Sequence, residues 1–135
     1  MMTSLSYDCC RYDNLLDAIR TVETCSCVCE QSHNALGDGG KSLGPYQIGK
    51  AYWTDACQKD KSLTEWSYET VKQDWYARKV IIAYWNRYAP DAADNETLAR
   101  IHNGGGGIMR KRGTKAWNNT TVYWEKVERK LNVNS

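Results

Sequence analysis

The sequence contains no phenylalanine, no long apolar run and no N-terminal leader pattern. Without about 18 consecutive apolar residues, no segment is long enough to span a bilayer as a helix. Met1–Tyr7 lacks the apolar centre of a signal peptide, so we expect either an intracellular chain or a secreted chain whose signal has been removed. Internal repeats, low-complexity tracts, linkers and nucleic-acid-binding motifs are also absent. A length of 135 residues therefore predicts a single domain, residues 1–135.

Tryptophan and tyrosine take the place of phenylalanine, with six Trp and nine Tyr in the chain. Both side chains combine a large apolar area with a polar group, so most are expected in the core and some along a wet cleft. The net charge is +2, but residues 108–135 hold seven Lys or Arg against two Glu, a local charge of +5. Such a segment is most often a solvated surface, and its alternative role is to attract an anionic polymer such as a bacterial wall.

Six cysteines lie at positions 9, 10, 25, 27, 29 and 57. An even count in a short chain favours disulfides and an oxidising compartment. We expect at least two disulfides, one of them joining the Cys9–Cys10 region to the Cys25–Cys29 segment. The alternative is a soft metal held by Cys25, Cys27 and Cys29, but no second cluster with metal-ligand spacing accompanies them. We therefore predict no metal and no cofactor.

Apolar periodicity predicts a mostly helical α+β chain. Asn14 is the expected N-cap of the first helix, Ser62–Glu65 has the form of a capping box, and Pro90 ends the longest helix. The longest helix is expected to bury Val71, Trp75, Ile82 and Trp85 on one face. The expected helices span residues 14–23, 51–57, 67–88, 96–102 and 121–131.

A glycine-rich stretch separates the first two expected helices. Residues 34–48 contain Gly37, Gly39, Gly40, Gly44 and Pro45. Asp38-Gly39 is a hairpin-turn pattern. One small β-hairpin is therefore predicted within residues 34–50, after the first helix.

Two carboxylates flank this junction between helix and hairpin. Glu23 follows an apolar helical face, so its partial burial is expected, whereas Asp38 lies among glycines whose amides can hydrogen-bond to a carboxylate and keep it ionised. Glycosidic cleavage uses such a pair, one carboxyl group as a proton donor and the other as a charged nucleophile or stabiliser. Taken alone the pair is a weak indication, because a helix-terminal Glu is usually a surface charge and Asp-Gly is usually only a turn.

The GPYQI sequence at 44–48 and the RIHNGG sequence at 100–105 are specific as a combination. Together with several further segments they resemble the invertebrate-type lysozymes, also called the destabilase family, over roughly residues 14 to 128. The matching segments, in chain order, are 16–23, 37–48, 51–56, 83–88, 99–105 and 123–127.

The resemblance implies a lysozyme-like fold and a peptidoglycan hydrolase that cleaves the β-1,4 bond between N-acetylmuramic acid and N-acetylglucosamine. It assigns Glu23 as the general acid and Asp38 as the nucleophile or stabiliser of a retaining mechanism. Four further residues fall on segments that line the family's cleft, and these predicted substrate-binding residues are Ser42, Tyr46, His102 and Asn103. The partner implied is bacterial cell-wall polysaccharide, acted on by a monomer that is secreted or phagosomal or lysosomal.

The sequence departs from the family's pattern between Glu23 and Gly37. This stretch is longer than in the relatives and adds Glu30 as a rival carboxylate. Some family members are also isopeptidases that use a Ser with a Lys or His. Ser42 is present here, but Gly49 follows Ile48 where those members have Lys. Isopeptidase activity and a non-catalytic wall-binding role therefore remain the alternatives to muramidase activity.

Overall fold

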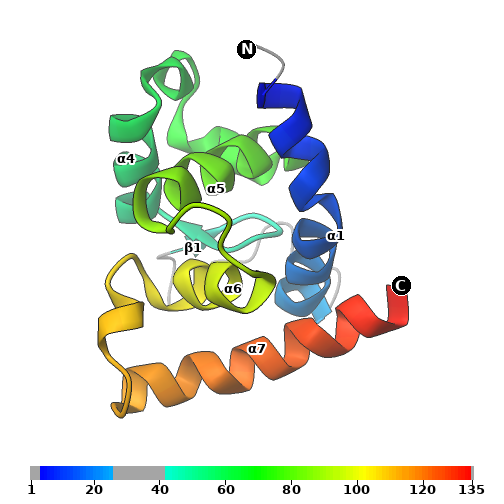
Figure 1. The fold of residues 1–135 in the computed structure, drawn as a ribbon. Helices are drawn as coiled ribbons and strands as arrows, with labels where there is room; N and C mark the ends of the chain where they lie inside the picture. Colours follow the sequence, from blue (N-terminus) through cyan, green and yellow to red (C-terminus); the bar gives the residue numbers. More distant parts are fainter. Residues whose placement is uncertain (1–3, 26–41, 135) are drawn as a thin grey trace.

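The structure, a computed structural model, describes residues 4–25 and 42–134, with side chains described for 11–24 and 42–133. Helices dominate this part of the chain and two-residue strands form a single hairpin, which confirms the mostly helical α+β prediction (Figure 1). The α-helices are α1 (Ser4–Cys25), α4 (Lys50–Lys59), α5 (Asp74–Tyr88), α6 (Asn95–Gly104) and α7 (Lys115–Asn134). Short 3-10 helices are η1 (Lys61–Glu65), η2 (Tyr68–Lys72) and η3 (Ile108–Arg110), and the strands are β1 (Ser42–Leu43) and β2 (Ile48–Gly49).

Helix α1 is longer than its apolar pattern predicted. It begins at Ser4, so Asn14 lies inside the helix and not at its N-cap, and that prediction is wrong. Residues 4–13 contain no Gly or Pro to stop the helix, and their mixed polarity gives no period that marks them as helical. The predicted core face is confirmed, because Leu15, Leu16, Ile19 and Val22 are all buried.

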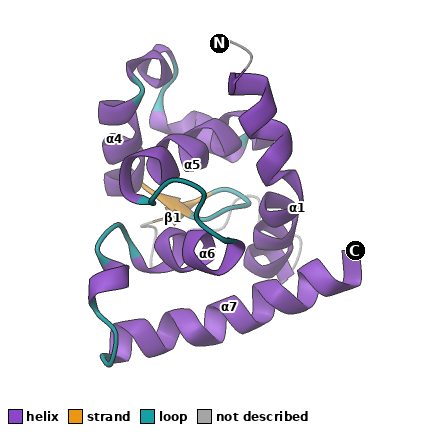
Figure 2. Cartoon of the chain, in the orientation of Figure 1, coloured by secondary structure: helices purple, strands orange, loops and turns teal. Residues whose placement is uncertain are grey.

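The hairpin lies within the predicted range, between the first helix and the rest of the chain. Strands β1 and β2 pair antiparallel, with Ser42 opposite Gly49 and Leu43 opposite Ile48. Their connection is the turn Gly44–Gln47, closed by the Gln47 N–H donating to the Gly44 carbonyl at 3.0 Å. Gly44 has φ +80°, and a Cβ there would lie 2.7 Å from the Val71 carbonyl oxygen, so only glycine fits. Figure 2 shows the described strand between α5 and α6.

The expected helix at 67–88 is in fact two helices separated by an extended residue. Gln73, with φ −90° and ψ 131°, separates η2 from α5. The break changes the helical phase, so Trp75 is 46% exposed although Val71, Ile82 and Trp85 are buried as predicted. Helix α5 buries eight of its fifteen residues and ends next to Pro90 as predicted. Such burial is typical of the central helix of a core.

The start of η1 also differs from the predicted capping box. The carboxylate of Asp60 accepts hydrogen bonds from the Ser62 backbone N–H at 3.1 Å and the Ser62 hydroxyl at 2.7 Å. Asp60 therefore caps the helix, and Ser62 lies inside it. A short carboxylate immediately before the first turn is as good an N-cap as serine, and the sequence pattern did not distinguish the two.

The C-terminal helices pack as a pair beneath the rest of the molecule. Figure 1 shows α7 running below α6 and the lower end of α1. The guanidinium of Arg100, on α6, lies 4.0 Å from the centre of the Trp117 ring on α7 and hydrogen-bonds to Thr120 and Thr121. Helix α6 confirms the expected helix at 96–102. The final helix spans far more than the expected 121–131.

Among the described residues, no helix combines the length and apolar character needed to cross a membrane.

Candidate active site

Glu23 lies in the last turns of α1 and is half-buried. Its Oε2 accepts a hydrogen bond from the phenol of Tyr123 on α7 at 2.9 Å. Burial, and after it the charge of Glu23, raises the pKa of Tyr123 well above its ordinary value. The pKa of Tyr52 on α4 is raised by burial, by Tyr84 and by Glu23. The carboxylate is therefore hydrogen-bonded to one neutral phenol, from α7, and close enough to a second, from α4, to raise the pKa of that phenol.

A hydrogen-bonded chain continues from Tyr52 through His102 on α6. The Tyr52 hydroxyl lies 2.8 Å from His102 Nδ1, and His102 Nε2 lies 3.2 Å from the backbone carbonyl oxygen of Tyr46. A carbonyl oxygen only accepts, so Nε2 carries the ring proton and Nδ1 accepts from Tyr52. Tyr52 also stacks on Tyr84, with ring centres 3.7 Å apart.

His102 is neutral in this setting. It is buried, and burial lowers its pKa to about 4, against a smaller opposing effect of the hydrogen bond to Tyr46. Both ring nitrogens are engaged, one as donor and one as acceptor. His102 therefore connects α6 to α4 and to the hairpin turn, and its ring has no free nitrogen to take up a proton.

Tyr46 extends the same network to the far side of the hairpin turn. Its fully buried phenol donates to Asp74 Oδ1 at 2.5 Å, and Asp74 pairs with Arg20 at 3.0 Å and with Arg78 at 2.9 Å. Burial opposes ionisation of Asp74. The hydrogen bond from Tyr46 and the charges of Arg78 and Arg20 outweigh it and lower its pKa. Arg78 also binds Asp13 and Asp17 of α1. The turn is thus held between α6 on one side and α1 and α5 on the other.

The glycine run after His102 packs closely against aromatic rings of α5. The Gly106 N–H donates to the Tyr84 hydroxyl at 3.0 Å. A Cβ on Gly106 would collide with the Tyr88 ring, reaching 2.7 Å from Cε1. Glycine is therefore required at 106 by close packing, and the run keeps Tyr84 in place behind Tyr52.

The other predicted site residues divide into three groups. Ser42, on β1, is half-buried, and Asn103, on α6, is exposed. Tyr46 and His102 are buried, with protein partners for their polar groups. Asp38 lies outside the described residues, as do the rival Glu30 and the expected turn at Asp38-Gly39.

Of the six cysteines, one has a described side chain. Cys57, on α4, is a buried free thiol whose pKa is raised by burial and by Asp60. The side chains of the other five fall outside the described part of the chain, so the predicted disulfides remain a prediction. Within residues 11–24 and 42–133, no group of three His, Cys, Asp or Glu could hold a metal ion.

Comparison with family models gives a match to Destabilase over residues 16–129. The chain belongs to the destabilase family. The match spans most of the sequence and includes every segment that builds the network around Glu23. A search of curated proteins finds no match. The family is one of lysozyme-like and isopeptidase-type hydrolases. That the chain belongs to it confirms the resemblance inferred from the sequence.

Sequence reasoning missed three tyrosines in the network that includes Glu23 of this destabilase-family chain. Tyr123 hydrogen-bonds to Glu23, Tyr52 hydrogen-bonds to His102, and Tyr84 stacks on Tyr52. All three lie inside the quoted matching segments, and the chain's excess of tyrosine over phenylalanine was the available signal. The sequence did not show which residues these tyrosines contact, because the three come from three different helices.

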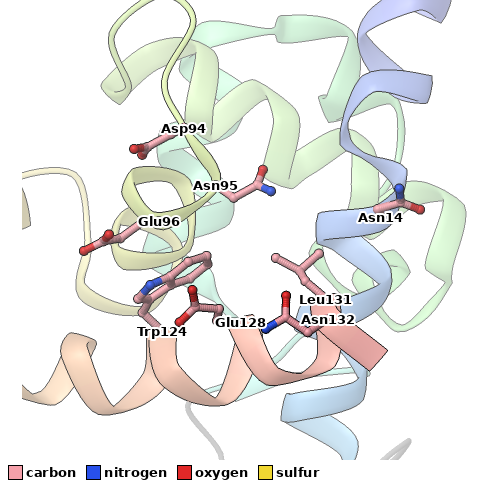
Figure 3. Close-up of a pocket in the computed structure, with 8 residues that line it drawn as sticks. All are labelled: Asn14, Asp94, Asn95, Glu96, Trp124, Glu128, Leu131 and Asn132. Carbon is pink, nitrogen blue, oxygen red and sulfur yellow. The ribbon is translucent and has the colours of Figure 1, made fainter. Parts of the chain in front are cut away.

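A separate groove of about 540 Å³ lies between α1, α6 and α7 (Figure 3). Glu23 does not line it. Two of its carboxylates already have structural partners: Asp94 caps the Thr97 N–H at 2.9 Å, and Glu96 pairs with Arg100 at 2.8 Å. The groove is lined by Asn14, Asp94, Asn95, Glu96, Trp124, Glu128, Leu131 and Asn132.

Proposed function

We propose that this chain is a muramidase that hydrolyses the β-1,4 bond between N-acetylmuramic acid and N-acetylglucosamine in peptidoglycan. The observation that carries the proposal is the position of Glu23 in a chain of the destabilase family. The carboxyl group is half-buried at the end of α1, within hydrogen-bond distance of the Tyr123 phenol and near enough to Tyr52 to raise the pKa of that tyrosine. A carboxylic acid in aromatic surroundings is suited to hold a proton and donate it to a leaving oxygen.

Asp38 is the second carboxylate of the proposal. In a retaining mechanism it attacks or stabilises the sugar cation while Glu23 protonates the leaving group, and Glu23 then acts as base toward water. In the sequence Asp38 lies among glycines, four residues before β1. The reaction needs no cofactor and no metal.

Substrate contacts are assigned in the same proposal. Ser42 and Asn103 have accessible polar groups that can bind sugar hydroxyl or acetamido groups. Tyr46 and His102 are buried, and the hydrogen bond between them keeps the hairpin turn against α6. The charge of +5 in residues 108–135 supports attraction to an anionic wall polymer. We further propose a single-domain monomer that works outside the cell or in a lysosomal or phagosomal compartment, with an antimicrobial or digestive role.

Isopeptidase activity is the second candidate, and the surroundings of His102 disfavour it. A nucleophilic Ser42 needs a neighbouring base. His102 already donates from Nε2 to Tyr46 and accepts at Nδ1 from Tyr52, and its pKa of about 4 makes it a weak base. Release of lysine from a γ-glutamyl-lysine substrate, compared with clearing of a bacterial suspension, distinguishes the two activities.

Replacement of Glu23 by glutamine tests the proposal directly. Glutamine keeps the size of Glu and can accept the hydrogen bond from Tyr123, but it has no acidic proton to give. General acid catalysis contributes about 10²–10⁴-fold, so clearing of a wall suspension should slow by at least about a hundredfold while the far-UV spectrum is unchanged.

Two control variants make this result specific. Glu125→Gln removes the same charge from an exposed position on α7 and should retain the parent rate. Glu30→Gln should also retain it. If Glu30→Gln loses activity and Glu23→Gln keeps it, the acid lies in the longer stretch after α1 and the assignment of Glu23 is wrong.

A further inference from the structure

The contact between Tyr123 and Glu23 joins residues that are 100 positions apart. The phenol lies 2.9 Å from Oε2, and the tyrosine is only 8% exposed. Its neighbours on the same face of α7, Thr120 and Val127, are buried as well. Close packing on this face fixes the ring, so the direction of its hydroxyl donor is set by the fold.

We propose that Tyr123 is a positioning residue that determines which oxygen of Glu23 carries the acidic proton. The inference rests on the proposed function and adds a residue to it. A phenol has one proton, and that of Tyr123 is given to Oε2. A protonated carboxyl group accepts best at its carbonyl oxygen, so Oε2 is the carbonyl oxygen and the proton lies on Oε1.

This assignment matters because a general acid must present its proton within hydrogen-bond reach of the leaving oxygen. A carboxyl group without a fixed partner exchanges its two oxygens by rotation and carries the proton on either of them. Tyr123 removes this freedom. Tyr123 therefore contributes to the orientation of the acid. Its loss should lower kcat without an equal effect on KM.

The same hydrogen bond should also affect the ionisation of Glu23. Donation to the carboxylate stabilises its charged form, and partial burial opposes this. Within residues 11–24 and 42–133, the titratable groups that interact with Glu23 include Tyr123 from α7 and Tyr52 from α4. Both phenols have raised pKa values and stay neutral through the range in which carboxyl groups titrate. Beyond Tyr52, His102 is neutral above a pH of about 4.

Tyr123→Phe is the test, because it removes the donor and keeps the ring. The titration of Glu23 is followed by NMR in protein with ¹³C-labelled glutamate, and its resonance is identified by its loss in Glu23→Gln. A hydrogen bond to a charged group corresponds to roughly one to two pK units, so the midpoint of Glu23 should rise by that amount. The basic limb of the pH profile for wall cleavage should move upward equally. At its optimum, kcat should fall by roughly tenfold to a hundredfold, with KM changed less than twofold.

Tyr76→Phe is the matched control. It also deletes a buried phenol, but one that donates to the Leu63 carbonyl and accepts from Trp53. It should leave the midpoint of Glu23 and the basic limb where they are in the parent. An unchanged midpoint in folded Tyr123→Phe, or a loss confined to KM, would overturn the inference.

The NMR measurement also keeps the inference separate from the proposed function. If the parent cleaves no wall polysaccharide, muramidase activity is refuted. The change in the titration midpoint of Glu23 between the parent and Tyr123→Phe still decides whether Tyr123 orients this residue. If Tyr123→Phe does not fold, the Tyr123 ¹³Cζ resonance in the parent is followed against pH. It should follow the ionisation of Glu23 and lose that step in Glu23→Gln, and a resonance that does not respond would overturn the inference.

Discussion

Acidification should destabilise this protein through His102. The ring is neutral and buried, with a pKa of about 4 in the folded state and 6.5 as its ordinary value. Because the folded pKa is the lower one, the unfolded chain binds more protons between these two values. The neutral His102 ring therefore contributes its full share to the free energy of unfolding above the unfolded pKa of 6.5. This contribution is lost as the pH falls toward 4.

The expected loss follows from the two pKa values. At pH 4 the ring is almost fully protonated in the unfolded chain and half-protonated in the folded one. The linkage relation then gives a cost of about 3 kcal/mol between pH 7.5 and pH 4. His102 is only 7% exposed, so solvent does little to screen this effect. A domain has only about 5–15 kcal/mol of total stability, and a loss of this size is readily measured.

His102→Gln isolates the contribution. Glutamine has an N–H donor for the Tyr46 carbonyl and an oxygen acceptor for the Tyr52 hydroxyl, but it does not titrate. Urea unfolding at half-unit steps between pH 7.5 and pH 4 gives the free energy of unfolding of each protein. The parent should lose about 3 kcal/mol more than the variant over this range. Carboxyl groups such as Asp74 are present in both proteins, so their contributions to the pH dependence of unfolding cancel in the comparison. Parallel curves for parent and variant would refute the assignment of a buried neutral ring.

Two further predictions concern packing and cysteine chemistry. Gly106→Ala places a methyl group against the Tyr88 ring and should cost about 1–3 kcal/mol. Thermal unfolding measures this cost, and Gly107→Ala, which approaches only the flexible Arg110 side chain, should melt within about a degree or two of the parent. Equal melting of the two variants would contradict the close packing at Gly106. Alkylation of the denatured, unreduced chain should label Cys57, and mass spectrometry should find no more than two labelled cysteines. Six labelled cysteines would exclude the predicted disulfides.

Apolar periodicity identified the helices that are short and bounded by breaking residues. The helices at 51–57 and 96–102 were predicted close to their actual positions, and the glycines at 104–107 mark the end of the second. The N-terminal half of α1 has no such face, and its helical state depends on continuation from the apolar half. The break at Gln73 involves neither Gly nor Pro, so nothing in the local sequence announced that the phase of the helix changes before Trp75.

The candidate site could be predicted only as far as its motifs extend. Glu23 and the segments carrying Tyr46 and His102 were found because short sequence patterns mark them. The partners of these residues depend on tertiary packing. Tyr123 reaches Glu23 only because α7 lies across the end of α1, and no spacing rule links positions 23 and 123. The burial of His102, which decides its protonation state, follows equally from packing and not from its own segment.

The position of Tyr123 on the last helix has a consequence for biosynthesis. A chain still on the ribosome can fold its N-terminal helices first, but it contains Glu23 long before it contains Tyr123, the hydrogen-bond donor to this residue. Contacts of such long sequence separation form late. Glu23 and its partner meet only when α7 has been made and docked. Unfinished chains that lack α7 therefore lack the hydrogen bond from Tyr123 to Glu23.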